Sequence, residues 1–319
     1  MTEHMTEQAP AQAGTRTAKP AFLPSDIDPT VFDEAFLRQL ERLQLIMKAP
    51  VRGGLKGGRR SVKRGQSVEF ADFRDYALGD DLRLLDWNVL ARLEKLFIKL
   101  YVEEEDVTIH FLLDASASMA TGNPAKLLFA KRAAAALGYI GLASEDRVAV
   151  TALAARAGRR QVALRGSGRV FRLLAALSAI GAADGPTDLV ASVRHAAAQL
   201  TGRGMIVLLS DLLDPAADKV IRELAATGSE LIVLHLLSPD ELDPSIEGDV
   251  RLVDVETGDG LDVTIDLATL DDYKARLAAW QEGFAELAGR RGATYVPLST
   301  DVPLAELVFA ELRRRRVLG

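Results

Sequence analysis

The sequence lacks cysteine altogether and has no long hydrophobic run. Without cysteine the chain has no disulfide framework, no thiolate metal site and no cysteine nucleophile. The longest uncharged apolar stretch runs from Ala133 to Ser144, which is well short of the about 20 residues that span a bilayer. Residues 1–20 lack the apolar core of a secretory signal. We therefore expect a soluble, cytoplasmic protein that does not insert into a membrane.

Positive charge is not in excess, since 39 Lys and Arg residues face 45 Asp and Glu residues, for a net charge of −6. Binding to nucleic acid requires concentrated positive charge, so we expect no nucleic-acid partner. The stretch Arg52–Arg64 is the exception, because it is basic and glycine-rich and contains no acid. We interpret it as an exposed loop; nucleic-acid binding through it would weaken steeply with salt.

Composition otherwise indicates a globular chain, with 48% hydrophobic and 26% charged residues among 319. That length allows one or two domains at about 150 residues each. Residues 1–25 are polar and are predicted to be a disordered tail. Residues 26–105 are predicted to form an N-terminal extension module, and residues 106–319 an α/β domain.

The α/β prediction depends on apolar runs that alternate with helical patterns from residue 107 onward. The expected strands are residues 107–113, 147–153, 161–165, 205–210, 230–237 and 293–298, with a hairpin around residues 256–260. The expected helices are residues 125–143, 171–180, 189–200, 215–226, 268–290 and 303–315. Continuous apolar runs are typical of strands buried on both faces. We predict an open, doubly wound, mostly parallel sheet.

Short oxygen-bearing side chains follow three of these elements. Asp114, Ser116 and Ser118 come directly after the first strand, Thr187 precedes a helix, and Asp211 ends the strand at 205–210. Ligands bind at the carboxyl edge of such sheets, and hydroxyl and carboxylate oxygens suit Mg²⁺ or Mn²⁺. An ordinary strand-to-helix turn with capping serines is the alternative interpretation of the first three residues.

This pattern resembles the von Willebrand factor A-type (VWA) domain and its metal-ion-dependent adhesion site (MIDAS). Asp114, Ser116 and Ser118 match the first motif of that site, Thr187 the second and Asp211 the third. The resemblance implies direct coordination by the three hydroxyls, with the two aspartates holding metal-bound waters and a partner's carboxylate completing the shell. Pro186 departs from the pattern, because a second glycine is common at that position.

The preceding module carries a second resemblance, to the bacterial domain-of-unknown-function family 58. The matching residues, in order, are Gly58–Ser61, Gly65, Glu69, Phe70, Arg74, Tyr76, Gly79–Asp81, Arg83, Asp86, Trp87, Ala91, Arg92, Lys99 and Glu103–Glu105. Cytosolic members of this VWA-like family resemble partners of MoxR-type AAA+ ATPases with chaperone-like roles. For this chain we interpret Asp80, Asp81, Arg83, Asp86 and Arg92 as a structural ion network and Trp87 as its buried anchor.

We therefore expect a metal-dependent adaptor rather than an enzyme. It would bridge an acidic residue of a partner or client protein through Mg²⁺ or Mn²⁺ and act with a MoxR-type ATPase in maturing or remodelling clients. The alternative is a metal-dependent phosphoester hydrolase that uses the same edge of the sheet, with Asp188 or Asp214 as its base. Turnover that is lost in Asp114→Ala would favour that alternative.

Overall fold

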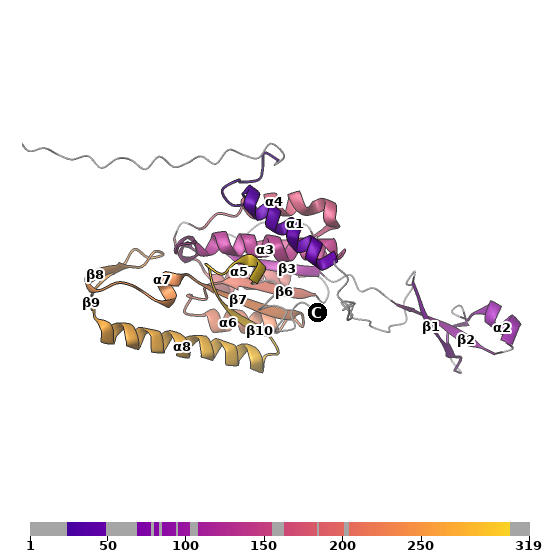
Figure 1. Ribbon diagram of the computed structural model, residues 1–319. Helices are drawn as coiled ribbons and strands as arrows, with labels where there is room; N and C mark the ends of the chain where they lie inside the picture. Colours follow the sequence, from indigo (N-terminus) through magenta and orange to yellow (C-terminus); the bar gives the residue numbers. More distant parts are fainter. Residues whose placement is uncertain are drawn as a thin grey trace, which may run out of the picture.

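The computed structural model describes residues 24–48, 69–77, 80–82, 85–93, 95–102, 108–154, 163–183, 185–200 and 204–306 (Figure 1). The basic loop at 52–64 and all but the last two residues of the predicted tail at 1–25 lie outside these ranges. The predicted final helix at 303–315 begins as α9 (Leu304–Glu306), where the described residues end. Among the described residues, no helix is both long enough and apolar enough to cross a membrane.

Six strands form the central sheet, and five of them are parallel. In spatial order they are β10 (Thr294–Ser299), β7 (Glu230–Leu237), β6 (Met205–Ser210), β3 (Thr108–Asp114), β4 (Arg147–Leu153) and β5 (Leu164–Arg165). Only β5, at one edge, runs antiparallel to its neighbour. The inner strands β3, β6 and β7 are buried along most of their length, as continuous apolar runs require.

Helices cover both faces of this sheet (Figure 1). One face packs against α1 (Glu34–Lys48), α3 (Lys126–Ala143) and α4 (Val170–Ser178). The opposite face packs against α5 (Leu189–Ala198), α6 (Ala217–Ala225) and α8 (Leu267–Arg290). Alternate residues of each strand supply the two cores, because successive side chains point to opposite faces. The prediction of an open, doubly wound, mostly parallel α/β sheet is confirmed.

Helix α1 belongs to the stretch predicted as an N-terminal module, but it packs on the main sheet's helical layer. Phe32, Phe36 and Leu40 lie in the same hydrophobic core as α3. Arg132 of α3 donates a hydrogen bond to the Val31 carbonyl at 2.8 Å. The beginning of the module therefore shares its core with the α/β domain.

The remainder of the module is a small unit that stands away from the main sheet (Figure 1). It contains β1 (Glu69–Asp75) and β2 (Phe97–Val102), which pair antiparallel, and α2 (Trp87–Leu93). Arg74 binds Asp80 through two hydrogen bonds of 2.7 Å, and Asp86 accepts the Asn88 backbone N–H at the start of α2. The expectation that Trp87 is a buried anchor is wrong, because this residue is 64% exposed. A two-stranded unit has too little volume to enclose it.

The order of the strands places a switch point beside β3. After β3 the chain moves outward to β4 and β5, then crosses back to β6 on the other side of β3 and continues to β7 and β10. The carboxyl ends of β3 and β6 are therefore adjacent, and the connections leave them in opposite directions. Open α/β sheets bind ligands at such a crevice.

A β-hairpin, formed by β8 (Gly248–Val253) and β9 (Gly260–Ile265), comes later in the chain than β7. It follows the short helix α7 (Pro239–Leu242) and leads directly into α8 (Figure 1). The sequence predicted this hairpin, and the structure confirms it.

Candidate functional site

The turn after β3 brings three of the predicted side chains together. Asp114 Oδ1 accepts the Ser116 backbone N–H at 2.9 Å, and this bond folds the chain back into a short 3₁₀ turn. The Ser116 and Ser118 hydroxyl oxygens lie 2.9 Å apart. All three residues are buried. The turn thus gathers one carboxylate and two hydroxyls at the carboxyl edge of the sheet.

The end of β6 supplies the neighbouring part of the site. The Ser210 hydroxyl donates to Asp114 Oδ2 and joins the ends of the two strands. Leu212 adopts a left-handed backbone conformation, with φ of 54°, and its backbone N–H donates to the Ser210 hydroxyl at 3.0 Å. This conformation is unusual for a leucine, and it fixes the backbone directly after Asp211. Asp211 is 1% exposed, so both aspartates of the site are buried.

Thr187 comes from the loop before α5, which is tied to both strand ends. The Ala183 backbone N–H donates to the Ala115 carbonyl at 2.6 Å, and the Leu189 N–H donates to Asp214 Oδ2 at 3.4 Å. The Thr187 hydroxyl oxygen is buried and has no hydrogen-bond partner among the described residues. A buried hydroxyl without a partner is costly and uncommon.

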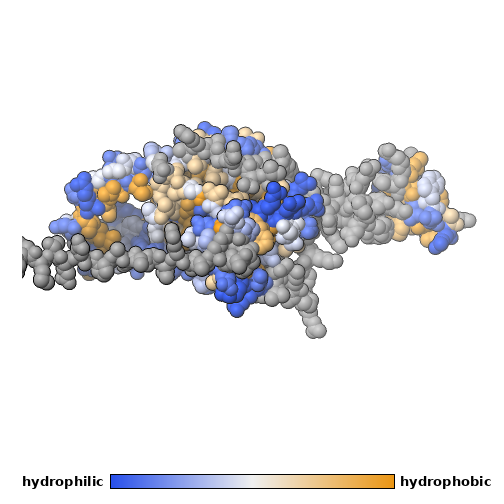
Figure 2. Space-filling view, turned by 90° about the horizontal axis from the view of Figure 1, so that it is seen from above, coloured by the Kyte–Doolittle hydropathy of each residue, from blue (hydrophilic) through white to orange (hydrophobic). Residues whose placement is uncertain are grey.

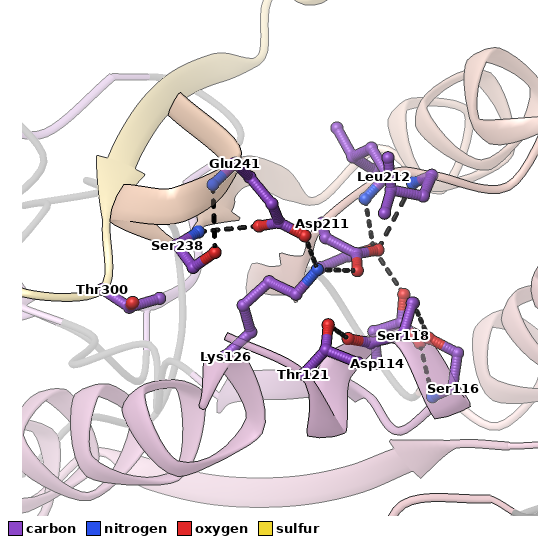
Figure 3. A network of polar contacts seen from close by, with 12 residues as sticks. Asp114, Ser116, Ser118, Thr121, Lys126, Asp211, Leu212, Ser238, Glu241 and Thr300 are labelled. Carbon is purple, nitrogen blue, oxygen red and sulfur yellow. Dashed lines mark hydrogen bonds and ion pairs between the residues drawn. The ribbon is translucent and has the colours of Figure 1, made fainter. Parts of the chain in front are cut away.

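Lys126, which the sequence interpretation missed, lies fully buried beside Asp211 (Figure 3). Its ammonium is 2.8 Å from Asp211 Oδ2 and also binds Glu241 Oε1. Lys126 is the first residue of α3, where a positive charge opposes the helix dipole. That placement was the available signal in the sequence, since a cation at a helix start needs nearby acids to stabilise it.

The charges in this cluster alter several pKa values. Burial, followed by repulsion from Asp211, raises the pKa of Asp114 to about 6. Burial alone would lower the pKa of Lys126, but Asp211 and Glu241 outweigh it and raise the pKa above its ordinary value. Lys126 therefore remains charged and compensates Asp211, whereas Asp114 is held by hydroxyl and amide donors without a cationic partner among the described residues.

His235 on β7 buttresses the backbone of Asp211. Its Nε2 lies 2.9 Å from the Asp211 carbonyl oxygen, and its Nδ1 contacts the Tyr295 hydroxyl. Burial lowers the pKa of His235 to about 4, so the ring is neutral and donates one proton. The side chain of His235 is fully buried.

The donor set is of the kind that hard divalent cations prefer. It comprises the carboxylates of Asp114 and Asp211 and the hydroxyls of Ser116, Ser118 and Thr187, all of them oxygen. In the part of the chain that the structure describes, no three acidic or histidine side chains form a metal-binding group by themselves. A cation here would therefore depend on the hydroxyls, of which the Thr187 oxygen has no other partner.

The two acids considered as catalytic bases serve the starts of helices. Asp188 caps α5 by accepting the Ala191 backbone N–H at 2.8 Å. Asp214 accepts the Ala216 N–H at 2.7 Å and the Leu189 N–H at 3.4 Å. Both carboxylates therefore have structural roles at this edge of the sheet.

Two solved structures that match part of this chain resemble it only weakly and are remote in sequence. BatB from Bacteroides thetaiotaomicron, a conserved hypothetical protein, is 16% identical with a TM-score of 0.42, and the match covers 67% of this chain and 100% of BatB. An aerotolerance-related membrane protein from Bacteroides fragilis is 20% identical with a TM-score of 0.35, and the match covers 60% of this chain and 91% of that one.

Whole-length relatives occur in mycobacteria. The uncharacterized protein Rv1480 of Mycobacterium tuberculosis and the uncharacterized protein Mb1516 of Mycobacterium bovis are each 29% identical over 307 residues, covering 94% of this chain and 95% of the relative. The sequence profile described as protein of unknown function DUF58 matches residues 72–283, which is more than half of the chain. The chain belongs to the DUF58 family.

Proposed function

We propose that this protein is a metal-dependent protein-interaction subunit of the VWA type, with a divalent cation held at a MIDAS-type site. Asp114, Ser116, Ser118, Thr187 and Asp211 would hold Mg²⁺ or Mn²⁺ at the carboxyl edge of the sheet. The bound cation would supply an open coordination position for an acidic side chain of a partner protein. Docking, rather than a chemical step, is then the function of the site.

The buried, unpartnered hydroxyl of Thr187 is the observation that carries this proposal. Water or protein donors normally satisfy such a group. Its loop is anchored on one side to the turn that carries Ser116 and Ser118 and on the other to the segment after β6. A cation bound to these oxygens would satisfy the hydroxyl and offset the charge of Asp114, which has no cationic partner among the described residues.

An adaptor role is better supported than hydrolysis. Metal-assisted hydrolysis needs an activated water and a nearby base. Asp188 and Asp214 are engaged by backbone donors, and the ring of His235 contacts Asp211 and Tyr295 on its two nitrogens. The site is therefore rich in ligands but poor in available proton acceptors among the described residues.

The proposed partners are a MoxR-type AAA+ ATPase and a client protein, in a chaperone-like maturation or remodelling process in the cytoplasm. The sequence contains no phosphate-binding loop of the G-x-x-x-x-G-K-[ST] type. Hydrolysis of ATP would accordingly take place in the partner, and this chain would couple to it by docking.

The direct test is Mg²⁺ titration by calorimetry on the wild type and on Ser118→Ala. We expect binding to the wild type and a loss of at least about tenfold in affinity in the variant, because one ligand is removed. Ser144→Ala, at the exposed end of α3, removes a serine hydroxyl far from the site and is the matched control. Equal affinity in all three proteins would contradict the proposal.

The partner is tested by capture from a lysate of the source cell in Mg²⁺ and in EDTA. An AAA+ ATPase retained by the wild type in Mg²⁺, but lost in EDTA and with Ser118→Ala, is the expected result. If the same partners are retained in EDTA and by Ser118→Ala, the interface lies elsewhere on the protein. Metal-dependent phosphatase turnover that is lost in Asp114→Ala would instead favour the hydrolase alternative.

A further inference from the structure

The β8–β9 hairpin has one apolar face and one polar face. In its register Leu252 lies directly opposite Leu261, and Val250 lies directly opposite Val263. Successive side chains of a strand point to opposite faces, so these four residues share a face with Ile265. The other face carries polar side chains apart from Val253. The hairpin is therefore an amphipathic two-stranded sheet.

The body of the protein leaves the apolar face of the hairpin largely uncovered. Leu252 and Leu261 are exposed, and the other three aliphatic side chains of this face are only half-buried. None of the five belongs to either hydrophobic core, and no described helix or strand packs extensively against β8 or β9. Figure 2 shows hydrophobic side chains gathered at the end of the molecule that carries the hairpin. A two-stranded hairpin is marginally stable by itself, so a partner that covers this face also stabilises it.

The hairpin is also strongly acidic. Residues 247–262 contain six Asp and Glu residues and a single basic residue, Arg251. The side chain of Arg251 lies over Gly260 on the polar face, because a Cβ added to Gly260 would lie 2.6 Å from Arg251 Nε. The one basic side chain of the hairpin is thus directed away from the apolar face.

This charge distinguishes between the possible occupants of the face. A second copy of the chain would bring its own acidic hairpin against this one, and like charges repel. Nucleic acid and anionic membranes are repelled for the same reason. A basic protein segment is attracted instead, since the two sides of a protein interface carry complementary potentials.

The dimensions of the face fit a helix. Each strand has six residues, which corresponds to about 20 Å at about 3.3 Å per residue. A helix of about 13 residues has the same length, and its apolar stripe can lie along the two strands.

We propose that the apolar face of the hairpin is a docking surface for an amphipathic helix of a partner protein, with aliphatic residues on one side and Lys or Arg on the other. The leucines of that helix pack on Leu252 and Leu261, and its basic residues meet the acids of the hairpin. No residue of this surface belongs to the candidate cation site. The inference therefore goes beyond the proposed function, and this docking needs no metal.

The test is fluorescence anisotropy with the full chain in EDTA and a labelled peptide of about 14 residues that has Leu at helical spacing and Lys elsewhere. We expect saturable binding that weakens with salt, and weaker binding of the same peptide with Glu in place of Lys or with its residues in scrambled order. The double variant Leu252→Ser, Leu261→Ser should lose at least about tenfold in affinity, because two aliphatic contacts are removed.

Val253→Ser is the matched control. Val253 is the neighbour of Leu252 in the same strand and is 62% exposed, against 64% for Leu261, but it lies on the opposite face. This variant should bind the peptide as the wild type does. Because all three side chains are exposed and lie outside the two cores, urea unfolding should show that both variants remain folded.

Three results would overturn the inference. Equal affinity of the wild type and the double variant would show that charge alone attracts the peptide. Equal binding of the Glu peptide would remove the basic partner. A wild-type dimer in sedimentation that the double variant dissociates would show that a second copy covers the face. The peptide measurements are made in EDTA, so their failure leaves the proposed function standing.

Discussion

The carboxyl edge of the sheet has two halves that use similar side chains differently. At the ends of β7 and β10, Ser238 and Thr300 are buried and fully engaged. Ser238 forms a capping box with Glu241 at the start of α7, and the Thr300 hydroxyl donates to the Pro124 carbonyl at 2.9 Å. At the ends of β3 and β6, the hydroxyls of Ser116 and Ser118 contact each other, and that of Thr187 has no described partner.

This difference separates structural polar groups from those available to a ligand. A buried hydroxyl that bonds to backbone atoms contributes to stability, whereas one that lacks a partner lowers stability until something binds to it. Glu241 links the two halves, because it closes the capping box with one carboxylate oxygen and binds Lys126 with the other. Gly122 also allows the halves to approach, since a Cβ there would lie 2.6 Å from the Ser238 Cβ.

The largest expected loss of stability comes from replacing Lys126, which binds Glu241 and Asp211. Lys126→Met leaves the buried Asp211 without its cation, and removing one partner of a buried ion pair destabilises a protein by about 3–5 kcal/mol. We expect a loss of this size in the free energy of unfolding, measured in urea. A loss within about 1 kcal/mol of zero would show that Asp211 does not need this partner.

Lys131 on the same helix is the matched control. It is also buried, but burial lowers its pKa, and among the described residues it forms no close ion pair. Lys131→Met should therefore leave the free energy of unfolding unchanged or raise it slightly. Equal losses in the two variants would indicate that α3 simply does not tolerate methionine at its buried lysines.

Ser238→Ala tests the half of the edge at the ends of β7 and β10, where the hydroxyls bond to the protein itself. Loss of this capping serine should lower the free energy of unfolding by about 1 kcal/mol and leave the affinity for Mg²⁺ unchanged. Ser118→Ala should show the opposite pattern, with weaker Mg²⁺ binding and little change in stability. Thermal unfolding and calorimetric titration of both variants measure the two quantities side by side. Identical patterns in both variants would remove the distinction between the halves.

The sequence predicted most of the sheet because its strands are continuous apolar runs. Strand β6 was predicted with the bounds that the structure has, and β4 likewise. The predicted site residues come from three separate segments, and the structure brings Asp114 and Asp211 close enough for their charges to interact. The parallel order of the strands is responsible, because it places their carboxyl ends at one edge.

What the sequence did not reveal depends on contacts between distant residues. Lys126 and Glu241 meet across 115 positions of the chain; the position of Lys126 at a helix start indicates that it needs acidic partners, but nothing local in the sequence identifies Glu241 as one of them. Trp87 was misjudged for a related reason, because burial of an aromatic side chain needs a surrounding core that the β1–β2 unit does not provide.

The smallest effect on stability is expected for Thr187→Val. Its comparison with Thr300→Val distinguishes the two halves of the edge most clearly. Removing a buried hydroxyl that has no partner costs no hydrogen bond, so the metal-free protein should unfold with unchanged free energy or gain up to about 1 kcal/mol. Thr300→Val makes the same chemical change in the other half, but it orphans the Pro124 carbonyl and should cost about 1–3 kcal/mol.

The affinity for Mg²⁺ should show the opposite pattern in these two variants. Thr187→Val should lose most of its affinity for Mg²⁺, and Thr187→Ser, which keeps the hydroxyl, should retain it. Thr300→Val should bind Mg²⁺ as the wild type does, because its hydroxyl is directed to Pro124. Urea unfolding in EDTA and calorimetry in Mg²⁺ measure both properties. A destabilised Thr187→Val with normal Mg²⁺ affinity would show that the hydroxyl has a structural partner, and the two halves of the edge would then be alike.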